Sequence, residues 1–157
     1  MIQFGKENNV VTAPFVRNIS ENDMNKVTFV ISLSRYGKAD DDTEIENQQL
    51  RNILTDAVPI IPDYDDTYEI VFEDYILYQT RNESYCSLDK YEIAKGKYFV
   101  IYEKSRLLDM LGQITDCQQL NDGSYYPSEW VHYGICCQNH IVDIISCNEP
   151  LIRKLND

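Results

Sequence analysis

Four side chains that can bind a metal or attack a substrate lie close together in the sequence. They are His132, Cys136, Cys137 and His140. A structural zinc site usually takes paired ligands from two distant segments, whereas these four fall within one predicted hairpin. Strand alternation would also place His132 and Cys136 on one face and Cys137 on the other. We therefore expect buried thiols beside a hydrogen-bonded histidine, and we predict no metal and no cofactor.

Cysteine and histidine also allow nucleophilic catalysis. A cysteine nucleophile needs a histidine base within hydrogen-bond contact and a third group that orients the base. The candidate nucleophiles are Cys86, Cys117 and Cys147, the candidate bases are His132 and His140, and the candidate orienting group is Asp143. No spacing selects one pairing. The sequence therefore assigns no catalytic residue and leaves enzymatic activity an open question.

Polar side chains gather at two predicted strand ends, where binding sites are common. One group is Arg81-Asn82-Glu83-Ser84-Tyr85 and the other is Lys104-Ser105-Arg106. Together with a histidine they define a candidate pocket made of Arg81, Glu83, Ser84, Ser105, Arg106 and His132. A small-ligand-binding or enzymatic domain would use Arg81 or Arg106 to hold an anion. The alternative interpretation is a loop and a helix cap without a ligand.

Acidic residues are concentrated between Asp40 and Asp74. That stretch holds twelve acids and one base, in a chain of 157 residues with a net charge of −12. Such a field attracts cationic surfaces and repels phosphate, so nucleic acid and anionic membrane are not expected partners. A predicted helix accounts for some of these acids through its dipole. The partner-binding residues predicted from the remainder are Asp63, Tyr64, Asp65, Asp66, Tyr68, Glu69 and Glu73.

The N-terminal residues lack the apolar segment and small-residue cleavage pattern of a secretory signal, so we expect a cytoplasmic protein. Five cysteines make an odd number, which fits free thiols in a reducing compartment. The longest apolar runs, such as residues 98–102, are much shorter than the roughly 20 residues needed to span a bilayer.

Hydrophobic periodicity predicts a single α+β domain over residues 1–157, with a mostly antiparallel sheet and two or three short helices. The expected strands are residues 27–34, 67–73, 75–80, 98–103, 130–136 and 141–147, the last two forming a hairpin. Residues 10–16 also have the composition of a strand, but Pro14 restricts them to an edge or a loop. The expected helices are residues 44–56, a segment capped by Ser105 and stopped by Gly112, and a C-terminal segment after Pro150. Residues 112–129 are expected to be irregular.

Several short motifs lie between Tyr75 and Ile145. They are Tyr75-Ile76-Leu77-Tyr78, Arg81-Asn82-Glu83-Ser84-Tyr85, Lys104-Ser105-Arg106-Leu107-Leu108-Asp109, His132-Tyr133-Gly134 and His140-Ile141-Val142-Asp143-Ile144-Ile145. This pattern resembles small uncharacterised bacterial cytosolic proteins, and it implies such a domain without any activity. The small size and acidic profile are also similar to immunity proteins that neutralise basic nuclease toxins. That second similarity is one of composition, which does not establish function.

Two classes of function follow from these patterns, together with a third, structural alternative. The leading hypothesis is a non-enzymatic acidic binding protein of immunity type, which docks on a cationic protein through residues 40–74. The alternative is a small-ligand-binding or enzymatic domain with its site around Arg81, Glu83, Ser105, Arg106 and His132. A structural subunit of a homo-oligomer is the third.

Overall fold

Alternating burial identifies β2 (Lys26–Tyr36) as a half-buried strand, as its sequence predicts. Val27, Phe29 and Ile31 are completely buried on one side of this strand. The computed structural model describes residues 2–37, 49, 57–87 and 90–155. The helix expected over residues 44–56 lies outside the described residues, apart from Gln49.

The first sheet has four antiparallel strands in the order β1-β2-β3-β11. Its other strands are β1 (Phe15–Glu21), β3 (Ile60–Glu73) and β11 (Leu151–Leu155). β3 lies in the first half of the chain and pairs with β11, which lies near the C-terminal end of the described residues. The first sheet is therefore completed by two segments that lie far apart in sequence.

The second sheet has five antiparallel strands in the order β4-β10-β9-β6-β5. Its strands are β4 (Tyr75–Asn82), β5 (Ile93–Lys95), β6 (Phe99–Lys104), β9 (Val131–Cys136) and β10 (His140–Ser146). A 3-10 turn, η1 (Glu83–Tyr85), follows β4. A small hairpin of β7 (Gln118–Gln119) and β8 (Tyr125–Tyr126) stands apart from both sheets.

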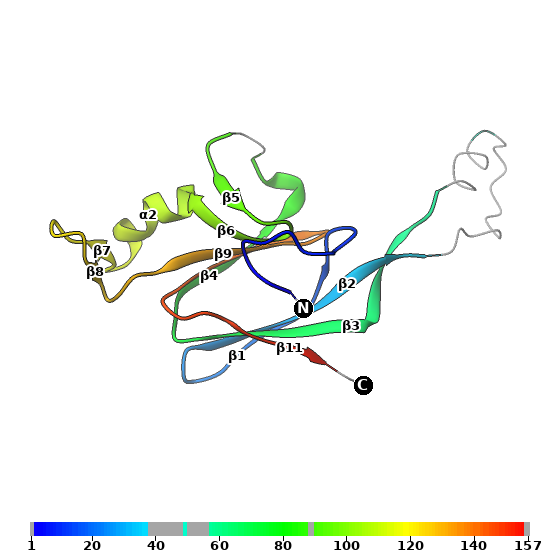
Figure 1. The fold of residues 1–157 in the computed structure, drawn as a ribbon, viewed down its shortest axis with the longest axis horizontal. Coiled ribbons are helices and arrows are strands. Elements are labelled where there is room, and N and C mark those ends of the chain that lie inside the picture. Colours follow the sequence, from blue (N-terminus) through cyan, green and yellow to red (C-terminus); the bar gives the residue numbers. More distant parts are fainter. Residues whose placement is uncertain (1, 38–48, 50–56, 88–89, 156–157) are drawn as a thin grey trace.

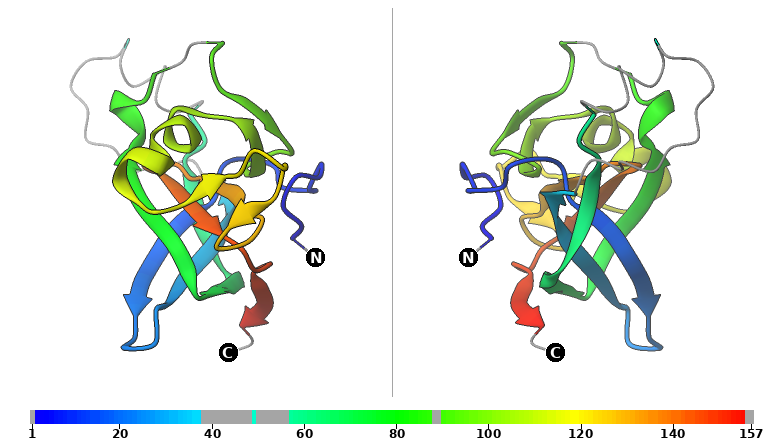
Figure 2. Two further views of the ribbon diagram at one scale, coloured as in Figure 1. Left: turned by 90° about the vertical axis from the view of Figure 1, so that its left-hand side faces the viewer. Right: turned by 90° about the vertical axis from the view of Figure 1, so that its right-hand side faces the viewer.

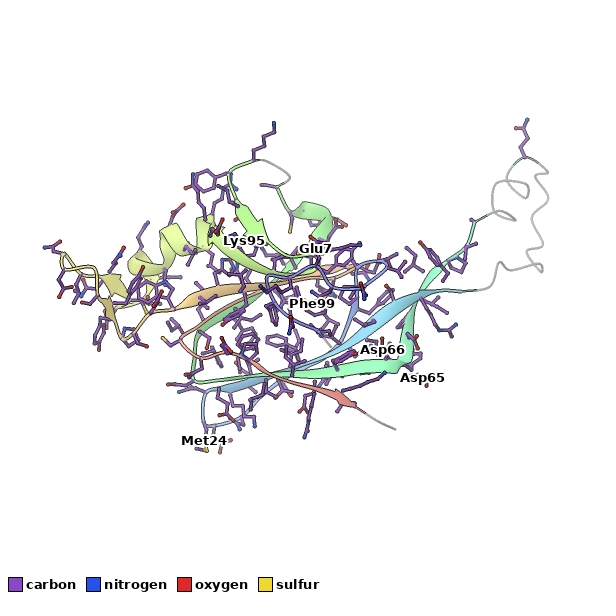
Figure 3. All side chains as sticks on the ribbon, viewed as in Figure 1. Glu7, Met24, Asp65, Asp66, Lys95 and Phe99 are labelled. Atoms are coloured by element: carbon purple, nitrogen blue, oxygen red, sulfur yellow. The ribbon has the colours of Figure 1, made fainter. Side chains whose placement is uncertain are left out.

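The two sheets pack face to face as layers, with the core between them (Figure 1). Seen from either end, the strands of the two layers cross (Figure 2). Aromatic rings fill the centre edge to face: Phe4 contacts Phe72, Phe99 and Tyr133 at centroid distances of 6.1, 5.7 and 5.2 Å. Phe99 is labelled between the layers in Figure 3. The sandwich is thus held by the hydrophobic faces of both sheets.

The helix α2 (Arg106–Ile114) covers the outer face of the second sheet near one end of the molecule. Its buried residues Leu107 and Leu111 pack against Ile145 of β10. Ser105 caps the helix, because its Oγ accepts a hydrogen bond from the amide of Leu108 at 3.0 Å. The predicted cap is confirmed, although the helix runs two residues beyond the predicted stop at Gly112.

The predicted hairpin of β9 and β10 is confirmed, with Val142 paired to Ile135. The phase slip predicted near Glu73 marks a true strand boundary, since Asp74 has a positive φ of 55° and β3 and β4 belong to different sheets. No helix among the described residues is long and apolar enough to cross a membrane.

Two expectations about the fold need correction. The prediction of a C-terminal helix after Pro150 was wrong, because residues 151–155 form β11 and pair with β3. The prediction of two or three short helices is not borne out. Among the described residues, α2 is the one α-helix whose start and end are both defined. Residues 112–129, expected to be irregular, contain the end of α2 and the β7–β8 hairpin. The fold is therefore richer in sheet than the sequence predicted.

Candidate functional site

The acidic stretch of β3 contains an unusual insertion in the sheet. Ser34 pairs with Pro62 and Ser32 pairs with Thr67, so four residues of β3 lie opposite the single residue Leu33. We call residues 63–66 the β3 bulge. The Asp63 carboxylate accepts a hydrogen bond from the amide of Asp65 at 3.2 Å, which turns the chain locally. Bulges re-aim side chains away from the regular ladder, and this one carries three acids and a tyrosine.

Tyr64 in the β3 bulge is held in place by Arg17 of β1, which lies beyond β2 in the same sheet. The Arg17 guanidinium donates a hydrogen bond to the Tyr64 hydroxyl at 3.1 Å and lies 4.5 Å from the centre of its ring. Arg17 itself occupies a register shift in β1, between Val16 and Asn18. Tyr64 remains 56% exposed. A fixed, exposed aromatic ring is the type of side chain that anchors protein interfaces.

A short antiparallel ribbon continues beyond the β3 bulge, on the side of the molecule away from α2 and the β7–β8 hairpin (Figure 1). We call residues 34–36 and 60–62, which pair with one another, the β2–β3 ribbon. Tyr36 is 58% exposed and Ile60 is 39% exposed. Figure 3 shows Asp65 and Asp66 where β3 bends towards this ribbon. Acidic and apolar side chains are therefore exposed side by side at this end.

Local ion pairs divide the predicted partner-binding residues. Three of the acids bind bases on adjacent strands: Asp66 to Lys154 at 2.8 Å, Glu69 to Arg153 at 2.6 Å and Glu73 to Lys26 at 3.7 Å. Tyr68 packs against the core. Asp63 and Asp65 form no ion pair with any described residue, although Asp63 lies within the electrostatic range of Lys154. The structure thus gathers Asp63, Tyr64 and Asp65 at the surface and gives the other four local roles.

The candidate pocket predicted at the strand ends contains a buried polar network, which we call the Asp143 network (Gln79, Arg81, Ser105, His132 and Asp143). Asp143 is completely buried on the outer face of β10. It accepts hydrogen bonds from Arg81 Nε at 2.8 Å, Arg81 Nη2 at 3.1 Å and Gln79 Nε2 at 3.0 Å. On its other side, Asp143 lies 3.1 Å from His132 Nε2. The network joins β4, β9, β10 and the start of α2.

Hydrogen bonding fixes the charges within the Asp143 network. Burial would raise the pKa of Asp143, but hydrogen bonds from His132, Arg81 and Gln79 outweigh burial and lower that pKa. Burial would likewise lower the pKa of Arg81, whereas the hydrogen bonds and charge of Asp143 raise it. The pair is therefore a carboxylate and a guanidinium at neutral pH.

Ser105, His132 and Asp143 are connected in the order of a hydrolase triad, but Ser105 is not placed as a nucleophile. Its Oγ lies 2.8 Å from His132 Nδ1 and also accepts the amide hydrogen of Leu108. Ser105 is completely buried, so a substrate has no access to it. The geometry is that of a helix cap joined to a buried ion pair.

Neither ring nitrogen of His132 is available to a cysteine, because Ser105 and Asp143 occupy both. Asp143 does orient this imidazole, as the sequence suggested. Burial raises the pKa of Cys136 to about 11, so its thiol is protonated at neutral pH. Among the described residues, no group of three or more acidic, histidine or cysteine side chains could hold a metal ion. Nothing in this arrangement supplies an activated nucleophile.

Next to the Asp143 network is a cleft of about 210 Å³ between β4 and α2. Its lining residues are Gln79, Arg81, Ser87, Glu92, Arg106, Leu107 and Met110. Arg81 and Arg106 of the predicted pocket thus meet in one cleft, and Ser105 and His132 are buried behind it. Glu83 and Ser84 lie in the exposed turn η1 and do not line it. Sequence reasoning missed Gln79 and Glu92, although Gln79 and Arg81 have the spacing of one strand face.

No protein-family model, curated protein or solved structure matches this chain. The function must therefore be inferred from the geometry of these two surfaces.

The lowered pKa of Asp143 predicts a specific pH dependence of stability. The folded state binds the Asp143 proton more weakly than the unfolded state, so ionised Asp143 stabilises the fold above the ordinary pKa of 3.8. That contribution is lost as the pH falls through 3.8 towards the lower pKa of the folded protein. We expect the difference in unfolding free energy between the wild type and Asp143→Asn to shrink over this range, measured by urea denaturation. A difference that stays constant down to low pH would contradict a charged Asp143.

Proposed function

We propose that the protein is a non-enzymatic binding protein of immunity type, which docks on a cationic surface of a partner protein through the β3 bulge and the β2–β3 ribbon. The observation that carries this proposal is the insertion of four residues into β3, which exposes Tyr64 and Asp65 beside a half-buried Asp63. An insertion of this size costs ladder hydrogen bonds, yet it leaves acids and an aromatic ring directed outwards.

The chemistry of this surface favours a basic protein over other partners. The carboxylates of Asp63 and Asp65, which form no ion pair with any described residue, would attract lysine and arginine side chains, and the net charge of −12 adds long-range attraction. Tyr64, Tyr36 and Ile60 supply the apolar contact area that charge alone lacks. Phosphate groups of nucleic acid would be repelled. The nucleic-acid-binding groove of a basic toxin has the matching charge, and covering it would neutralise the toxin without any catalysis.

The test compares two double variants that remove the same charge from opposite ends of the molecule. Asp63→Asn with Asp65→Asn neutralises the β3 bulge and keeps the Asp63 side-chain oxygen that accepts the Asp65 amide. Asp116→Asn with Glu129→Gln is the matched control, at the end that carries α2 and β7 (Figure 1). The partner is the product of an adjacent toxin-like gene or a basic protein recovered from the native cell at low salt.

We expect neutralisation of the β3 bulge to slow association by about tenfold at low ionic strength, because complementary charge mainly sets the on-rate. The control should change the on-rate much less, and the difference should vanish in about 1 M salt. Stopped-flow or surface-plasmon measurements across a salt series give the association rates of the two double variants. Equal effects of the two double variants would show that only net charge matters, and the docking surface would then lie elsewhere.

A further inference from the structure

Two basic residues, Arg81 and Arg106, line the cleft between β4 and α2. Residues 81–106 contain six bases and four acids, although the net charge of the whole chain is −12. Lys104 and Arg106 both lie over the ring of Tyr91, at 4.0 and 4.7 Å from its centre. The cleft therefore offers two guanidinium groups to an anionic group of a ligand.

Arg81 gives the cleft a guanidinium whose position is fixed in advance. Two of its nitrogens bind the buried Asp143, while the side chain as a whole is 34% exposed. A guanidinium has five N–H groups, so donors remain on the side that faces the cleft. A guanidinium held by a buried carboxylate loses little side-chain entropy when it binds a ligand.

The other lining residues restrict the ligand further. Glu92 lies at the first turn of α2, where its carboxylate accepts a hydrogen bond from the amide of Arg106 at 3.3 Å. A carboxylate beside two arginines repels a doubly charged anion but attracts an ammonium group. Leu107 and Met110 supply an apolar part of the wall, and Met110 is 40% exposed. The cleft thus offers positive, negative and apolar contacts within about 210 Å³.

We propose that this cleft binds a small zwitterion with an apolar side chain, of the size and chemistry of a free aliphatic amino acid. The ligand carboxylate would face Arg81 and Arg106, its ammonium group would face Glu92, and its side chain would pack on Leu107 and Met110. The volume is adequate, since a cavity of about 150 Å³ accepts a benzene-sized ligand. This site is separate from the β3 bulge, so either proposal can fail without the other.

Three probes of one carbon skeleton test the proposal: L-leucine, 4-methylpentanoate, which lacks the ammonium group, and 3-methylbutylamine, which lacks the carboxylate. Each is titrated into the ¹⁵N-labelled protein and followed by amide chemical shifts, with inorganic phosphate as a fourth probe. The variants are Glu92→Gln, which keeps an acceptor for the Arg106 amide, and Arg106→Gln. Lys97→Gln is the matched control, since it removes one positive charge outside the cleft. Arg81 is left intact because Asp143 depends on it.

We expect L-leucine to shift the amides of β4 and the first turn of α2, and to bind about tenfold more tightly than either partial analogue. Glu92→Gln should weaken L-leucine by about tenfold and should not weaken 4-methylpentanoate, which loses a repelling charge, whereas Arg106→Gln should weaken both. Lys97→Gln should change neither. The proposal is overturned if L-leucine produces no shifts at the cleft, if phosphate binds there more tightly, or if Glu92→Gln affects the two probes equally.

Discussion

Asp143→Ala is expected to lower the free energy of unfolding by about 3–5 kcal/mol, because it removes one partner of a buried ion pair and leaves the other without compensation. Arg81 would lose both of its hydrogen bonds to Asp143, and Gln79 and His132 would each lose one. The loss extends to α2, since His132 also contacts the capping residue Ser105. Urea denaturation at neutral pH measures the change directly.

An exposed ion pair in the first sheet, between Lys26 and Glu73, provides the comparison for this loss of stability. Glu73→Ala removes the partner of Lys26 at a pair whose side chains are 59% and 39% exposed, and it should cost less than about 1 kcal/mol. A loss below about 1 kcal/mol for Asp143→Ala would mean that water or a rearranged Arg81 satisfies the network. The buried ion pair would then be a minor element of the fold.

Gly96→Ala is expected to destabilise the protein by about 2–4 kcal/mol, for two additive physical reasons. Gly96 has a φ of +96°, a backbone conformation that residues other than glycine adopt only with strain. A Cβ atom there would also lie 2.7 Å from the Phe99 carbonyl oxygen and 2.9 Å from the backbone of Gly5. These are backbone atoms that cannot rotate away, and Gly5 donates a hydrogen bond to that same carbonyl oxygen at 2.9 Å. The N-terminal segment should therefore detach from the turn between β5 and β6.

Gly123→Ala separates the two reasons. Gly123 has a similar φ of +86°, but no atom lies within 4 Å of a Cβ added there. It should cost only the conformational strain, about 1 kcal/mol. Thermal or urea denaturation of both variants tests the difference. Equal losses at the two positions would show that the contact with Gly5 contributes nothing.

Strong local patterns in the sequence predicted the elements that the structure confirms. β2 alternates between partly buried and buried positions from Lys26 to Ile31, and the β9–β10 hairpin has two β-rich runs joined by a short connection. Ser105 predicted the start of α2 because capping depends on neighbouring residues alone. Each of these features is decided within one short segment of the chain, so no knowledge of the remaining chain was needed.

β11 was missed because contacts with a distant strand decide its conformation. Leu151, Ile152 and Leu155 have the spacing of a short helix, and Pro150 suits a helix start. In the sheet, Arg153 and Lys154 instead bind Glu69 and Asp66 of β3. Tertiary pairing overrides weak local preference in so short a segment. The same contacts explain why several acids of β3 are not free to bind a partner.

The candidate sites were predictable in part. Arg81, Ser105, Arg106 and His132 were grouped from the sequence, and the structure brings them to one network and its adjoining cleft. The central position of Asp143 depends on the pairing of β10 with β4 and β9, which no local pattern reveals. The β3 bulge was likewise hidden, because the strand was predicted to begin only at Thr67. Both depend on the register between strands.

The position of β11 at the edge of β3 also determines when the first sheet can be completed during synthesis. β1, β2 and β3 leave the ribosome in succession and can pair at once. One edge of β3 then remains unpaired while about 80 further residues are synthesised. During that interval β3 presents an open row of backbone donors and acceptors, of the kind that other chains can pair with. The acids along β3 repel a second copy of the same strand. Like charge along β3 therefore disfavours pairing between two such strands until Arg153 and Lys154 bind Glu69 and Asp66.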